Sequence, residues 1–112
     1  MRRIIRSLLN LNGNGKHPPK DVLIQQVRSG NNSLALSAIK HLRDALYLQD
    51  GSMHDVDLSH ANLKGARLAR AELQRVSLIG ANLTKCYLGA TNLTEATLVQ
   101  AVLQEANLRE IQ

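Results

Sequence analysis

The 112-residue sequence contains no tryptophan, no phenylalanine, two tyrosines and a single cysteine. Because aromatic side chains fill a large part of most protein cores, aliphatic side chains must do most of the packing here. One cysteine excludes an internal disulfide and is typical of a reducing compartment. No stretch approaches the roughly 20 apolar residues of a membrane-spanning helix. We also recognise no secretory signal, because Arg6 interrupts the apolar run near the start of the sequence.

The sequence also lacks the residue patterns that carry catalysis or metal binding. Its four histidines do not have the spacing of metal ligands, and no serine lies in a Gly-x-Ser-x-Gly context. No glycine-rich phosphate loop follows a predicted strand. We therefore expect a protein without enzymatic activity, without a metal and without a cofactor.

What the sequence does contain is a leucine at every fifth position in its second half, preceded two residues earlier by a small or slender residue such as Ala61 or Cys86. A period of five fits neither a helix nor an ordinary strand, whose side chains repeat every 3.6 and 2 residues. It fits a chain that turns a corner after every five residues. The predicted structural core consists of the eleven leucines Leu58, Leu63, Leu68, Leu73, Leu78, Leu83, Leu88, Leu93, Leu98, Leu103 and Leu108.

Divided into five-residue units, residues 56–110 begin VDLSH, ANLKG, ARLAR and end AVLQE, ANLRE. This resembles the pentapeptide-repeat family, whose pattern is A(D/N)LXX, although Arg67 and several other second positions depart from it. The resemblance implies a mainly β fold, a right-handed quadrilateral β-helix with one unit per side and about 2.75 coils. Residues 20 apart should then stack, with Lys85 over Glu105 and Arg75 over Glu95 as pairs of opposite charge.

The first half of the sequence predicts a helical cap with an N-terminal extension. Residues 21–28 form one predicted helix, and residues 33–47 form a second with Ser33 as its N-cap. We expect this pair to cover the N-terminal end of the β-helix; the alternative is a helix that binds a partner. The predicted regions are residues 1–19 (amphipathic segment and linker), 20–50 (helical cap) and 51–112 (β-helix).

Two sets of apolar residues are candidates for contact with a partner. Within residues 1–11, four apolar side chains share one helical face and arginines lie opposite, which suggests a membrane surface or a protein groove. The alternative is a frayed or locally packed terminus, because so short a helix is marginal in water. On the repeats, three apolar side chains point outward and could dock a partner or the N-terminal segment. The alternative is that they are ordinary exposed apolar residues. The predicted contact residues are Ile4, Ile5, Leu8, Leu9, Ile79, Val99 and Val102.

The charge distribution narrows the choice of partners. Residues 1–55 hold eight Lys and Arg against four Asp, whereas residues 56–112 hold six against five acidic residues. Some members of the family mimic double-stranded DNA and protect DNA gyrase. That mimicry needs a dense acidic face, and the mixed charge of residues 56–112 argues against it. No groove-reading helix or row of stacking aromatics accompanies the basic excess, so we do not expect nucleic acid as a partner.

The predicted function is that of a non-enzymatic scaffold or protein–protein interaction module in the bacterial cytoplasm. No capping helix follows Glu110, so we expect the open C-terminal coil to bind an unidentified protein or a second copy, unless the native chain continues beyond residue 112. One alternative is peripheral attachment to an anionic membrane surface, at the inner membrane face, through the basic amphipathic N-terminus. The other is a topoisomerase modulator of the DNA-mimic type.

Overall fold

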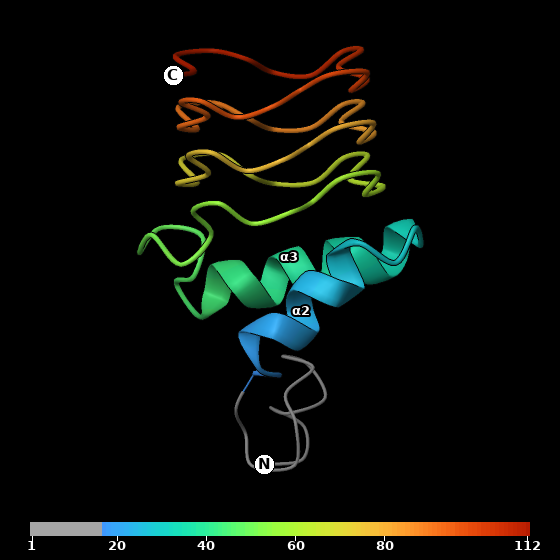
Figure 1. Cartoon of the computed structure of the whole chain (residues 1–112), viewed down its shortest axis with the longest axis vertical. Helices are drawn as coiled ribbons and strands as arrows, with labels where there is room; N and C mark the ends of the chain where they lie inside the picture. Colours follow the sequence, from blue (N-terminus) through green and yellow to red (C-terminus); the bar gives the residue numbers. More distant parts are fainter. Residues whose placement is uncertain (1–16) are drawn as a thin grey trace.

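The computed structural model describes residues 17–112 of the chain. Two helices, α2 (Lys20–Val27) and α3 (Asn32–Asp44), are followed by coils stacked on one another (Figure 1). We call residues 56–112 the repeat stack, and divide it into a first coil (56–75), a second coil (76–95) and a terminal coil (96–112). The helices lie against the first coil, and the terminal coil lies at the far end of the molecule.

The second helix begins earlier and ends earlier than predicted. Its N-cap is Asn31, whose side chain accepts a hydrogen bond from Leu34 N at 3.0 Å, so the prediction of Ser33 was wrong. Gly30 turns the chain with φ +84°, which leaves Asn31 extended and ready to cap. The helix ends at Asp44 because Leu46 takes the left-handed conformation, with φ +68°.

The prediction of a mainly β, right-handed quadrilateral β-helix was wrong. Residues 17–112 contain no continuous strand and no sheet; the coils are joined by seven isolated parallel bridges, such as Asp57 with Ser77. The reason is the shortness of each side. The fifth residue of each unit turns in the left-handed conformation, for example Arg70 (φ +63°) and Lys85 (φ +59°), so only one residue per unit forms a bridge.

The predicted register of 20 residues between stacked positions is confirmed by these bridges. Across one bridge, Leu63 N donates to Asn82 O at 2.9 Å, and Asn82 N donates to Ala61 O at 2.9 Å. This alternating pattern is that of a parallel ladder, restricted here to one residue at each side of the coil. Adjacent coils are therefore connected through their backbones at every unit.

Of the two charge pairs predicted from this register, one forms. Lys85 Nζ lies 3.8 Å from a carboxylate oxygen of Glu105, as expected for residues 20 apart. Arg75 does not pair with Glu95; it donates to Asp55 at 2.7 and 3.1 Å, one coil earlier. That bidentate geometry suits a guanidinium and a carboxylate better than a single contact does.

One apolar core runs from the helices through the stack. Leu23 and Val27 of α2 and Leu42 of α3 belong to the same buried cluster as the leucines of the first two coils. The leucines of the terminal coil are less enclosed: Leu98 and Leu103 are only partly buried. Leu108, which we expected in the core, is 42% exposed, and no coil of the described residues lies over it.

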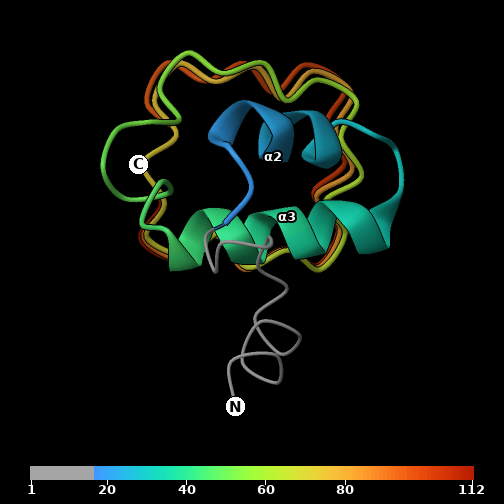
Figure 2. The same cartoon turned by 90° about the horizontal axis from the view of Figure 1, so that it is seen from below.

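Helices α2 and α3 lie across the lower end of the first coil. Seen from below, α2 lies within the outline of the coils and α3 runs along one of their sides (Figure 2). Asn32 Nδ2 donates to the carbonyl oxygens of Asn62 at 3.1 Å and Lys64 at 3.0 Å. Arg43 Nη1 donates to the carbonyl oxygen of Arg67 at 3.4 Å.

These carbonyl groups occupy a definite place in the ladder. Their equivalents in the second coil, at Asn82, Thr84 and Tyr87, accept N–H groups from the first coil at 2.8 to 2.9 Å. On the first coil there is no lower coil to supply such donors. The side chains of Asn32 and Arg43 supply them instead, so the helices close the edge chemically as well as covering the core.

Candidate functional site

The terminal coil combines exposed apolar side chains with backbone groups that have no partner. In the first coil, Leu58 N and Leu68 N each donate to the coil above at 2.8 Å. In the part of the chain that the structure describes, the N–H groups of Leu98, Leu103 and Leu108 form no backbone hydrogen bond. An edge of this kind can pair with another chain.

The predicted contact residues of the repeats lie on or next to this coil. Val99 is 60% exposed and Val102 is also exposed, and both belong to the terminal coil. Ile79 is half-buried one coil below Val99. The remaining predicted contact residues lie outside the described residues: Ile4, Ile5, Leu8 and Leu9.

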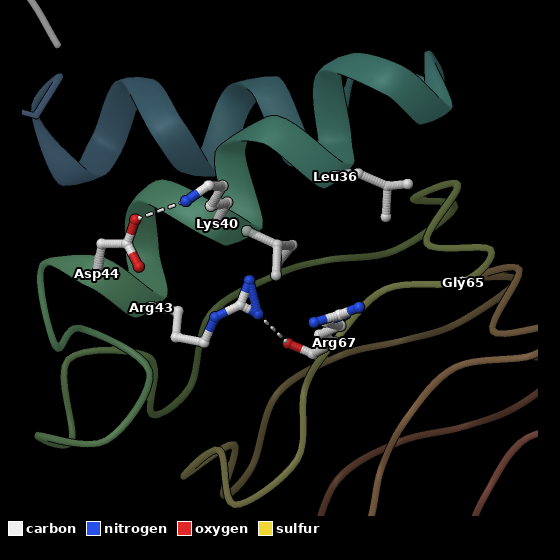
Figure 3. A pocket seen from close by; sticks show the side chains of 7 residues that line it. Leu36, Lys40, Arg43, Asp44, Gly65 and Arg67 are labelled. Carbon is white, nitrogen blue, oxygen red and sulfur yellow. Dashed lines mark hydrogen bonds and ion pairs between the residues drawn. The ribbon is translucent and has the colours of Figure 1, made fainter. Parts of the chain in front are cut away.

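A cleft of about 510 Å³ lies between α3 and the first coil (Figure 3). Sequence reasoning missed it, because its two walls are more than 20 residues apart in the chain. The one available signal was Arg67, which stands where the repeat pattern has Asp or Asn. The residues that line the cleft are Leu36, Ile39, Lys40, Arg43, Asp44, Gly65 and Arg67.

The charges around the cleft are unevenly matched. Lys40 Nζ and Asp44 Oδ2 form an ion pair at 3.1 Å, so the acidic side chain of the lining is already paired. Within residues 17–112, neither Arg43 nor Arg67 forms an ion pair. The guanidinium of Arg67 instead lies 5.9 Å from the ring centroid of Tyr87. The cleft therefore presents two cationic groups that are not neutralised by a neighbouring carboxylate.

A pair of histidines connects the segment before α2 to α3. The Nδ1 atoms of His17 and His41 are 2.8 Å apart, and the rings meet edge to face. His41 is only 4% exposed. Burial, followed by the nearby His17, lowers the pKa of His41 from its usual value. One ring must donate and the other accept in this contact, so it is incompatible with two protonated histidines.

Cys86 lies inside the stack and is a poor candidate for chemistry. Its Sγ donates to the carbonyl oxygen of Leu63 at 2.8 Å, and burial raises its pKa to about 11. The thiol is therefore protonated at neutral pH, whereas the thiolate is the nucleophilic form.

Neither helix within the described residues is long and apolar enough to cross a membrane.

Comparison with known proteins agrees with the repeat pattern. A family model described as "Pentapeptide repeats" matches residues 52–89 and 82–111, with eight copies of the repeat. These two matches together cover more than half of the chain. A comparison with curated proteins gives no match.

Proposed function

The chain belongs to the pentapeptide-repeat family, and from this premise we propose that it is a non-enzymatic interaction module whose terminal coil pairs with a second copy of the chain. The observation that carries the proposal is the terminal coil itself. Leu108 and Val99 are exposed there, in a coil whose leucine N–H groups form no backbone hydrogen bond within residues 17–112. Apolar area together with unpaired backbone is the usual composition of a sheet edge or coil end that takes a partner.

A second copy suits this surface because the coil offers both halves of a hydrogen-bonded ladder. Within the described residues the carbonyl oxygens of Ala96, Ala101 and Ala106 have no donor, and the N–H groups of the leucines two residues later have no acceptor. Two identical coils related by a two-fold axis could satisfy each other, and such isologous contacts are the commonest form of protein assembly. The contact would also bury the exposed leucine of each copy.

Size-exclusion chromatography with light scattering tests this proposal. We expect the 112-residue chain to elute as a dimer and Leu108→Glu to elute as a monomer, because a buried carboxylate next to apolar side chains is costly. Val22→Glu is the matched control: Val22 is 38% exposed, on α2 at the opposite end, and this variant should remain dimeric. Circular dichroism checks that both variants are folded. A wild-type chain that is monomeric at every concentration tested contradicts the proposal.

The two alternatives from the sequence stay predictions. The apolar and basic residues that would attach the chain to a membrane lie outside the described residues. A topoisomerase modulator of the DNA-mimic type would need an acidic face, whereas the repeat stack carries six basic and five acidic side chains. Within residues 17–112, the exposed side chains and the unpaired backbone groups of the terminal coil support pairing between two copies.

A further inference from the structure

We propose that the cleft between α3 and the first coil binds an acidic peptide segment that carries an aliphatic side chain. The carboxylates of the segment would meet Arg43 and Arg67, and its aliphatic side chain would lie against Leu36. Helix α3 and the first coil, which form the cleft, lie at the opposite end of the stack from the terminal coil (Figure 1). The inference does not depend on pairing between two copies, and the two can fail separately.

Arg43 and Arg67 bring cationic groups from both walls to the cleft. Arg43 reaches from α3 to the first coil, where its Nη1 lies 3.4 Å from the backbone carbonyl oxygen of Arg67 (Figure 3). Neither arginine has a carboxylate partner in the described part of the chain. An anion bound in the cleft would therefore be attracted by both charges.

The side chains that line the cleft do not neutralise one another's charges. Three cations, Lys40, Arg43 and Arg67, line it against one anion, Asp44. Asp44 is already paired with Lys40 at 3.1 Å. The two arginines therefore keep their full charge and most of their N–H donors, and the fork of a guanidinium matches the two oxygens of a carboxylate.

The cleft also has an apolar part. This part favours a peptide with an aliphatic side chain over a simple ion. Leu36 is only partly buried, so aliphatic surface adjoins the charged rim on α3, whereas Ile39, which also lines the cleft, is only 1% exposed. The volume of about 510 Å³ lies within the range of about 300–1,000 Å³ that is usual for ligand sites. A small anion would bind the guanidinium groups and leave the aliphatic surface exposed to water. A peptide with acidic and aliphatic side chains would bind the guanidinium groups and also cover the aliphatic surface.

The position of Arg67 also suits it to binding. Its guanidinium lies over the ring of Tyr87 at 5.9 Å, which restricts its movement before a ligand arrives. Gly65, on the same wall, contributes no side chain that would narrow the cleft. The site is thus partly organised in the free protein.

Titration of ¹⁵N-labelled full-length protein, followed by NMR, tests the assignment. The probe is a capped pentapeptide of four glutamates around a central leucine. Saturable shifts should appear at α3 and at residues 64–68, and binding should weaken as sodium chloride is raised. A peptide with glutamine in place of glutamate, and one with glycine in place of leucine, should each bind at least about threefold more weakly.

Variants separate the cleft from the general charge of the protein. Arg43→Gln and Arg67→Gln should each weaken binding about three- to tenfold, the loss expected for a charge-assisted contact. Arg70→Gln removes the same charge from the first coil outside the cleft and should change binding less than about twofold. Arg43→Lys keeps the charge and should bind with intermediate affinity, because it loses the forked geometry.

Three outcomes overturn the assignment. One is equal binding by the wild type and by the double variant Arg43→Gln with Arg67→Gln. Another is a set of shifts at the terminal coil in place of α3. The third is inorganic phosphate producing the same shifts with the same affinity as the peptide, which would leave a simple oxyanion site. Repeating the titration with Leu108→Glu tests whether a monomeric chain still binds the peptide. Peptide binding can therefore be judged even if the proposed dimer does not form.

Discussion

The two ends of the repeat stack are built from the same five-residue units but finish differently. At the first coil, Asn32 and Arg43 donate to carbonyl groups that would otherwise face solvent, and α2 and α3 cover the leucines. At the terminal coil, the leucine N–H groups have no acceptor within the described residues and Leu108 is exposed. The unit alone therefore does not decide whether its leucine is buried; the layer beside it does.

The largest expected effect compares two leucines of one column. Leu68 is 1% exposed in the first coil and Leu108 is 42% exposed two coils later. Leu68→Ala should lower the free energy of unfolding by about 2–5 kcal/mol, because it leaves a cavity between coils. Leu108→Ala should cost less than about 1 kcal/mol in the monomer, since water already reaches the side chain. Urea unfolding followed by circular dichroism measures both, and equal losses would break the comparison.

The second prediction concerns the closed edge. Asn32→Ala removes two hydrogen bonds to backbone carbonyls of the first coil and should cost about 1–3 kcal/mol. Asn107 is the matched asparagine at the open end, where its side chain accepts only from Arg109 N at 3.1 Å. Asn107→Ala should cost about 0.5–1 kcal/mol by the same measurement. A loss at Asn107 as large as that at Asn32 would contradict the edge-closing role of the helices.

The third prediction tests contact between neighbouring coils away from either end. Gly80 has φ +66°, and a Cβ built there would lie 2.6 Å from Nδ1 of His60 in the coil below. Gly65 has φ +75°, but a Cβ there meets nothing within 4 Å. Lys85 adopts a similar φ of +59°, so the turn itself tolerates a side chain.

We therefore expect Gly80→Ala to lower the free energy of unfolding by about 1 kcal/mol more than Gly65→Ala does. The excess comes from displacing the imidazole of His60 and not from the backbone conformation that both positions share. Combining Gly80→Ala with His60→Ala should remove this excess when thermal unfolding is compared at one pH. An excess that persists in the double variant would place the strain in the turn.

The smallest expected effect is a pH dependence confined to the helical end. The pKa of His41 is lowered in the folded protein, chiefly by burial, while in the unfolded chain it is close to the usual value of 6.5. Below pH 6.5 the unfolded chain therefore binds a proton that the folded chain resists, so stability falls as the pH is lowered through this value. Above pH 6.5 both states are neutral and the effect vanishes.

This pH dependence is measurable as a fall in the thermal midpoint between pH 7.5 and 5.5. His41→Gln should flatten the slope, because it removes the titrating group while keeping a polar side chain next to His17. Lys40 and Asp44, which also act on His41 from α3, remain in the variant. An unchanged slope in His41→Gln would assign the effect to other groups.

Parts of the fold followed from the sequence and parts did not. The resemblance to the repeat family implied the 20-residue register that the bridges show, because four units make one coil. The mainly β assignment, which the same resemblance implied, failed because a left-handed residue at the end of each unit leaves one bridging residue per side. The N-cap prediction failed for a local reason, the turn at Gly30 that selects Asn31.

The candidate surfaces divide in the same way. Val99 and Val102 could be recognised in the sequence as outward positions, since their place in the repeat defines their direction. The cleft could not, because Arg43 and Arg67 come from a helix and from a coil whose relative position no local pattern encodes. The same holds for the contact of His17 with His41, between residues 24 apart in the chain.

The sequence by itself determined the period of five and the row of leucines, and its resemblance to the repeat family implied the register between coils, because both depend only on a unit meeting its own copy. Only the tertiary structure decided which end of the stack is closed, which leucine stays exposed and which basic side chains line the cleft. These features depend on how α3 packs across the first coil, and that packing arises from contacts between segments that are distant in the sequence.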